Sequence, residues 1–108
     1  MEGLWTTPEY MASNPETCTA MVKALSKASK FVLENDAKAI SEPLKPVFGA
    51  LGDEVLDIGA GMVKAAVSSS GKFSQETLDV TQNVLQLNKS IERSMTLNEV
   101  FDGQFLAS

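Results

Sequence analysis

Few side chains in this 108-residue sequence could carry chemistry, and they form no catalytic pair. Histidine is absent, which removes the commonest general base and metal ligand at neutral pH. Cys18 is the single cysteine, so no internal disulfide can form. On an apolar helix face it is expected to be a small core residue rather than a nucleophile. We therefore predict a non-enzymatic chain with no catalytic residue, no metal site and no cofactor.

Two further clusters have a functional and a structural interpretation. Asp53, Glu54 and Asp57 could approach a cation, but carboxylates at a helix start ordinarily compensate the helix dipole in solvent. The run Gly59-Ala60-Gly61 is similar to part of a phosphate-binding loop. No strand precedes it and no third glycine follows at the required spacing, so helix packing explains it better.

The composition limits the classes of partner. Fourteen acidic residues outnumber nine basic ones, and the basic residues form no run, so we predict no nucleic-acid binding. No stretch reaches the roughly 18 apolar residues of a membrane span, so no membrane insertion is expected. Residues 1–5 lack a basic region followed by an apolar run, so we expect no signal peptide there, and the sequence leaves the localisation open.

Capping residues and apolar periodicity predict an all-α fold in a single domain over 1–108, with about five helices and a short C-terminal helical turn. Thr7, Asn14, Asp36 and Ser74 stand where helix N-caps are expected. Thr96 and Glu99 form a capping-box pattern before the last turn. Pro43 and Pro46 should break the third helix, and only residues 4–6 leave a strand open.

Apolar residues recur at helical spacing on the predicted helices. On the second helix these are Cys18, Met21, Ala24, Leu25, Ala28, Phe31 and Val32. On the fourth, the inward positions are expected to be Val55, Leu56, Gly59, Met62, Val63, Ala66 and Val67. The fifth carries Leu78, Val80, Val84, Leu85, Leu87 and Ile91.

Several short motifs occur in an order that resembles the C-terminal segment of a solute-binding protein family. They are TTPEYM at 6–11, NPET at 14–17, KALSKA at 23–28, FVLENDAKA at 31–39, GKFSQE at 71–76 and LNEVFDGQFL at 97–106. The family comprises the periplasmic proteins of the nitrate, sulfonate and thiamine-precursor ABC transporters. Pro43 and Pro46 depart from its pattern, because the corresponding helix is usually smoother.

The resemblance implies a helical segment that buttresses one lobe of a two-lobed protein. The intact family protein is periplasmic, captures a small solute between its lobes and delivers it to a membrane permease. The ligand-binding residues of this chain stay unknown, because none can be matched to a family motif, and the solute cannot be named. The segment alone is not expected to bind a ligand.

The alternative is a self-standing helical interaction module or adaptor that acts as a homo-oligomer. In both cases apolar helix faces need cover, and we expect self-association when the chain is isolated. The candidate interface residues are Trp5, Met21, Leu25, Phe31, Val84 and Phe101. For a dimer, Phe31→Asp should dissociate or unfold it, whereas Lys27→Asp on the opposite face should do neither.

Overall fold

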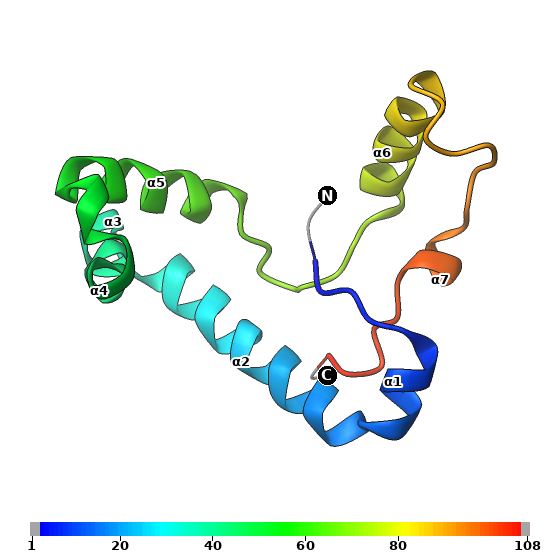
Figure 1. Ribbon diagram of the computed structural model, residues 1–108, viewed down its shortest axis with the longest axis horizontal. Coiled ribbons are helices and arrows are strands. Elements are labelled where there is room, and N and C mark those ends of the chain that lie inside the picture. The colour runs from blue at the N-terminus through cyan, green and yellow to red at the C-terminus, as the bar shows by residue number, and fades with distance from the viewer. Residues whose placement is uncertain (1–2, 107–108) are drawn as a thin grey trace. The chain divides into compact units, whose positions relative to one another are not determined.

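The computed structural model describes residues 3–106, and within them it contains helices joined by turns and irregular segments, without a strand (Figure 1). The all-α prediction is therefore confirmed. Residues 4–6, where a strand was left open, are irregular.

The helices begin and end close to the predicted positions. In chain order the elements are α1 (Pro8–Ser13), α2 (Pro15–Glu34), α3 (Ala37–Ser41), η1 (Glu42–Leu44), α4 (Lys45–Phe48), η2 (Gly49–Leu51), α5 (Asp53–Ala66), α6 (Gln75–Leu87) and α7 (Leu97–Val100), where η marks a 3₁₀ helix.

Three of the predicted N-caps form as expected. The side chain of Thr7 accepts from the N–H of Tyr10 at 3.1 Å, and Asp36 accepts from the N–H of Ala39 at 2.8 Å. Ser74 accepts from the N–H of Thr77 at 3.0 Å and so begins α6. Each cap satisfies a helix N–H that lacks a partner within its own helix.

Asn14 behaves differently from the prediction. Its side-chain amide donates to the carbonyl of Tyr10 at 3.3 Å, so it closes the C-terminal end of α1. Asn14 contributes to the start of α2 through its backbone carbonyl, which accepts from the N–H of Cys18. Asn14 is the single residue between α1 and α2, so its side chain can reach the end of one helix and the start of the other. Its amide group donates to the Tyr10 carbonyl of α1.

The prolines divide the third predicted helix into pieces. Pro43 lies in η1 and Pro46 lies in α4, each near the start of its own element, where the missing N–H costs no helical hydrogen bond. Gly52 then connects η2 to α5 with a φ of 84°, a backbone conformation that favours glycine.

The helices form two compact units. Unit 1 contains the described residues up to Val22 and those from Gly71 onward, and unit 2 is Lys23–Ser70. The chain passes between the units within α2. Whether 1–108 acts as a single domain stays a prediction.

Unit 2 is organised around the contact between α3 and α5. Ile40 on α3 and Leu56 and Ala60 on α5 are its buried apolar residues. Leu56 and Ala60 are four positions apart and therefore lie on one face of the helix.

Unit 1 has a similarly small core. Leu78 on α6 is buried, and the rings of Phe73 and Phe101 meet edge to face with centroids 5.2 Å apart. Gly71 adopts a φ of 68°, and a Cβ built there would lie 3.1 Å from Leu106. Glycine therefore suits this position for both its conformation and its size.

Several residues that were expected to face inward are exposed. Helix α2 contains no buried residue, and Cys18, expected to be a small core residue, is half-buried. On α5 the expectation was wrong for Val55, Gly59, Met62, Val63 and Ala66, which are exposed. A helix of this kind carries more apolar surface than its neighbours in the unit can cover.

Candidate functional site

The inner face of α5 carries charged residues that bind other elements of unit 2. The hydroxyl of Ser41, at the end of α3, hydrogen-bonds to the carboxylate of Asp57 and lies 3.0 Å from the carbonyl of Lys38. A serine hydroxyl has one proton, so it donates to one of these oxygens at a time. Ser41 is fully buried, and a substrate therefore cannot reach it as a nucleophile.

A second polar link joins α5 to the end of α2. The ammonium of Lys64 donates to the carbonyl of Asn35, and the side chain of Asn35 donates to the carbonyl of Phe31 at 2.8 Å. A cation at a helix C-terminus satisfies carbonyls that have no partner within the helix and interacts favourably with its dipole. Lys64 therefore has a structural role.

The third link lies at the start of α5. The ammonium of Lys45 is 2.8 Å from the carboxylate of Glu42 and 3.2 Å from that of Asp53. Hydrogen bonds to Glu42 first and Asp53 second raise the pKa of Lys45 above its ordinary value. Both ion pairs of Lys45 lie at the solvent-exposed surface, so their contribution to stability is small.

These links account for two members of the acidic cluster that the sequence placed at this helix start. Asp53 pairs with Lys45 and Asp57 with Ser41. Within residues 3–106, no group of three histidine, cysteine or acidic side chains comes close enough together to hold a metal ion. Gly59 and Gly61 lie within α5, where a phosphate-binding loop would need a turn.

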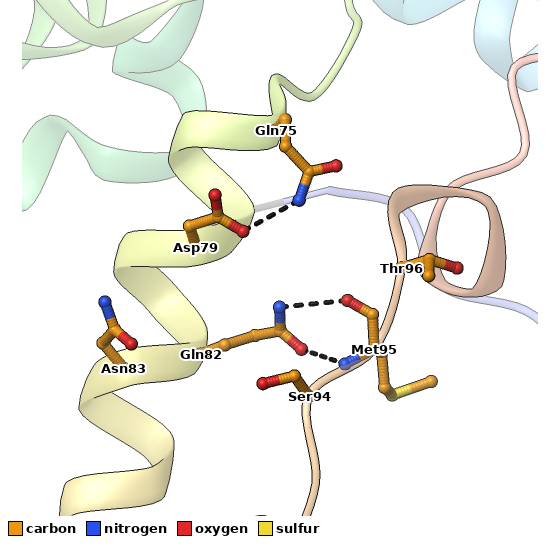
Figure 2. Close-up of a pocket in the computed structure, with 7 residues that line it drawn as sticks. All are labelled: Gln75, Asp79, Gln82, Asn83, Ser94, Met95 and Thr96. Carbon is orange, nitrogen blue, oxygen red and sulfur yellow. Dashed lines mark hydrogen bonds between the residues drawn. The ribbon is translucent and has the colours of Figure 1, made fainter.

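Unit 1 contains a shallow, open pocket of about 480 Å³ between α6 and the segment that precedes α7 (Figure 2). Its lining is mostly polar and comprises Gln75, Asp79, Gln82, Asn83, Ser94, Met95 and Thr96. Asp79 accepts from the amide of Gln75 at 2.8 Å. The lining offers amides, hydroxyls and one carboxylate, and lacks a second titratable group to complete an acid–base pair.

Gln82 organises this pocket. Its amide nitrogen donates to the carbonyl of Met95 at 3.0 Å, and its amide oxygen accepts from the N–H of Met95 (Figure 2). The side chain is buried although it is polar. Sequence analysis missed this role, and the available signal was its position between Leu78 and Leu85 on the inner face of α6.

The predicted capping box forms at the start of α7. The carboxylate of Glu99 accepts from the N–H of Thr96 at 2.7 Å and from the Thr96 hydroxyl at 3.1 Å. Arg93 lies 3.1 Å from the other carboxylate oxygen. The Thr96 N–H above all, and then Arg93, lower the pKa of Glu99.

The candidate interface residues are divided between the two units, with Leu25 and Phe31 in unit 2 and the other four in unit 1. Five are exposed: Trp5, Met21, Leu25, Phe31 and Val84, with Trp5 the most open at 72 %. Phe101 is half-buried, because its ring packs on Phe73. Cys18 carries a free thiol and is half-buried. The proposed role of these residues at an interface stays a prediction.

One face of α5 carries a run of exposed apolar residues. Val55, Ile58, Gly59, Met62 and Val63 recur at positions i, i+3, i+4, i+7 and i+8, which places them on one face of the helix. We call this face the α5 outer stripe. Its four large side chains are 53–70 % exposed. Its Val63 edge adjoins the buried pair Leu56 and Ala60, and Val55, Ile58 and Met62 lie further round the helix, opposite Asp57 and Lys64.

Comparisons with known proteins assign no family. No family model matches this chain, and the comparisons with curated proteins and with solved structures likewise give no match. Among the helices of residues 3–106, none is long and apolar enough to cross a membrane. The family resemblance therefore depends on the sequence motifs alone.

Proposed function

We propose that this chain is a non-enzymatic helical interaction module whose exposed apolar helix faces are covered by further copies of the chain. The observation that carries this proposal is the inverted distribution of apolar side chains. Among the described residues, four hydrophobic residues are buried, whereas eighteen large hydrophobic residues are exposed. Single exposed apolar side chains are ordinary, but faces made of several of them mark interaction surfaces.

The exposed residues form faces on the long helices. On α6, Val80, Val84 and Leu87 recur at helical spacing and are exposed. On α2, Met21, Leu25 and Phe31 are exposed as well. At roughly 25 cal/mol per Å² of apolar area, leaving such faces in water forgoes several kcal/mol, which is comparable to the whole stability of a small domain. Assembly is the simplest way to recover that free energy.

The chemistry of the polar sites supports a non-enzymatic role. The buried hydroxyl of Ser41 and the ammonium groups of Lys45 and Lys64 are all engaged in hydrogen bonds that hold unit 2 together. The pocket on α6 contains one carboxylate, and an amide of Gln75 already donates to it.

A second candidate function is the helical segment of an ABC-transporter solute-binding protein of the nitrate, sulfonate or thiamine-precursor type. One observation favours it: three of the quoted motifs, TTPEYM, NPET and GKFSQE, fall at helix boundaries, with Pro8 and Pro15 at the starts of α1 and α2 and Ser74 as the N-cap of α6. On this hypothesis the exposed faces cover a lobe, the intact protein is periplasmic, and its partners are a small solute and a membrane permease.

Sedimentation equilibrium at tens of micromolar tests the proposed function. We expect a defined oligomer, with circular dichroism showing helix. A strictly monomeric chain that unfolds cooperatively would refute the homo-oligomeric module. Calorimetry with nitrate, a sulfonate and a pyrimidine addresses the second candidate, for which the isolated chain should show no binding. Stoichiometric binding at micromolar affinity would contradict both the fragment interpretation and a purely structural role.

A further inference from the structure

We infer that the α5 outer stripe is the self-docking surface of this chain and that two copies pair there with their α5 helices antiparallel. This inference rests on the proposed function and specifies which face makes the contact. It starts from the way α5 distributes its side chains. Its charged residues Asp57 and Lys64 bind α3 and the end of α2 within unit 2, whereas an uncharged apolar stripe faces solvent.

An ordinary surface helix keeps its charged residues in water and its apolar residues inside, whereas α5 turns Asp57 and Lys64 toward the rest of unit 2 and leaves the stripe exposed. These two links hold the rotation of α5 about its axis, because turning the stripe inward would break both. The stripe therefore stays exposed within unit 2 and is available to a second copy.

The area of the stripe suits a dimer. Val47, Phe48 and Leu51 are also exposed and lie on α4 and η2, two elements that contact α5. Together with the four large side chains of the stripe, these residues carry on the order of 400 Å² of exposed apolar area. A standard interface buries about 800 Å² per partner, a little over half of it apolar. Helix α5 and the elements beside it thus carry exposed apolar area comparable to the apolar part of one stable interface.

The stripe is also better suited than the face on α6. Val80, Val84 and Leu87 share their side of α6 with Glu76 and Asn83, whereas the α5 outer stripe is flanked by one charged residue, Glu54, four positions before Ile58. Gly59 lies at its centre, and a Cβ built there would meet no atom within 4 Å. The backbones of two α5 helices can therefore approach closely at this residue.

Charge sets the direction of the pair. Asp53, Glu54 and Asp57 lie in the first half of α5 and Lys64 near its end. Parallel pairing would bring the two acidic ends together, whereas antiparallel pairing separates them. Antiparallel pairing also places the two helix dipoles in opposite directions, which is electrostatically favourable for helices lying side by side. With a two-fold axis at Gly59, Val55 of one copy lies opposite Val63 of the other, because both are four residues from the axis.

Substitutions on matched exposed positions test the surface. In sedimentation equilibrium, Ile58→Asp should weaken dimerisation by roughly thirtyfold or more, as for a central interface residue. Val84→Asp tests the competing apolar face on α6 and should leave the dimer intact when α5 makes the contact. Circular dichroism monitors folding in both. Dissociation by Val84→Asp but not by Ile58→Asp would overturn the α5 assignment and leave the proposed module standing; a monomeric parent chain would overturn both.

Cysteine cross-linking tests the direction without relying on stability. In a Cys18→Ser background, a mixture of Val55→Cys and Val63→Cys chains should form a mixed disulfide under mild oxidation. Val55→Cys chains alone should not, because their equivalent positions would lie about 12 Å apart along the helix axis, too far for a disulfide. If Val55→Cys chains cross-link efficiently with each other and the mixture gives no Val55–Val63 disulfide, the helices pair in parallel and the antiparallel geometry is overturned.

Discussion

The side chain of Gln82 on α6 pairs with the backbone of Met95 through both halves of its amide. The nitrogen donates to the Met95 carbonyl at 3.0 Å while the oxygen accepts from the Met95 N–H. This pairing attaches an irregular segment to a helix without a strand or a disulfide. It also gives both polar atoms of the Gln82 amide a hydrogen-bond partner, so the side chain can be buried in the core of unit 1.

Replacing Gln82 by leucine should destabilise unit 1. The substitution leaves the N–H and the carbonyl of Met95 without their partner, which costs about 1–3 kcal/mol for each buried group that water cannot reach. Urea unfolding followed by circular dichroism measures the loss. Gln86→Leu, one turn further along α6 and exposed, is the control and should change the free energy of unfolding by less than about 0.5 kcal/mol. Equal stability of the two variants would contradict the structural role of Gln82.

Truncating Leu78 to alanine should cost about 2–5 kcal/mol, because the residue is 2 % exposed and leaves a cavity in a small core. Leu87→Ala on the same helix is the matched control, since Leu87 is 85 % exposed. Its effect should stay within about 0.5 kcal/mol in a dilute monomeric sample. A large effect of Leu87→Ala under those conditions would show that α6 buries its other face.

The hydrogen bond between Ser41 and Asp57 should appear as coupling between α3 and α5. Ser41→Ala removes the donor and Asp57→Ala removes the acceptor, and the double variant completes the cycle. We expect a coupling free energy of about 1–2 kcal/mol in denaturant unfolding, because the acceptor is charged and the hydroxyl is buried. Ser26→Ala on the exposed surface of α2 provides the control. Strictly additive effects of Ser41→Ala and Asp57→Ala would rule out the contact.

The last helical turn should depend on pH through Glu99. Its pKa is lowered in the folded chain by the N–H of Thr96 first and by Arg93. The stability that the capping box gives to α7 is therefore fully present above the ordinary carboxyl pKa of about 4.3 and is lost as the pH falls through the lowered folded value. An NMR titration should show the Thr96 amide resonance following the Glu99 carboxyl.

Glu99→Gln keeps the acceptor geometry and removes the titration, so the Thr96 amide in that variant should be insensitive to pH over the same range. A Glu99 carboxyl that titrates above its ordinary value would contradict the capping geometry.

The opposite sign applies to Lys45, whose pKa is raised. The stability that its ion pairs contribute is present below the ordinary lysine pKa and disappears as the pH rises through the raised value.

Local sequence determined where the helices begin and end. The side chains of Thr7, Asp36 and Ser74 reach N–H groups three residues away, and such contacts depend only on neighbouring residues. The ring of Pro43 interrupts helical geometry for a similarly local reason. Asn14 is the exception, because its side chain can reach the end of α1 and the start of α2, and the local sequence does not determine which of the two it caps.

Tertiary structure decided which residues are covered. Apolar periodicity predicted one inward face on α5, but of the predicted residues only Leu56 is buried, together with Ala60. The links from Asp57 and Lys64 hold that rotation of the helix. The burial of Gln82 was equally invisible in the sequence, because it depends on the backbone of Met95, thirteen residues away. Periodicity shows that a helix has an apolar face, whereas only packing between distant segments determines whether that face is buried or left for another molecule.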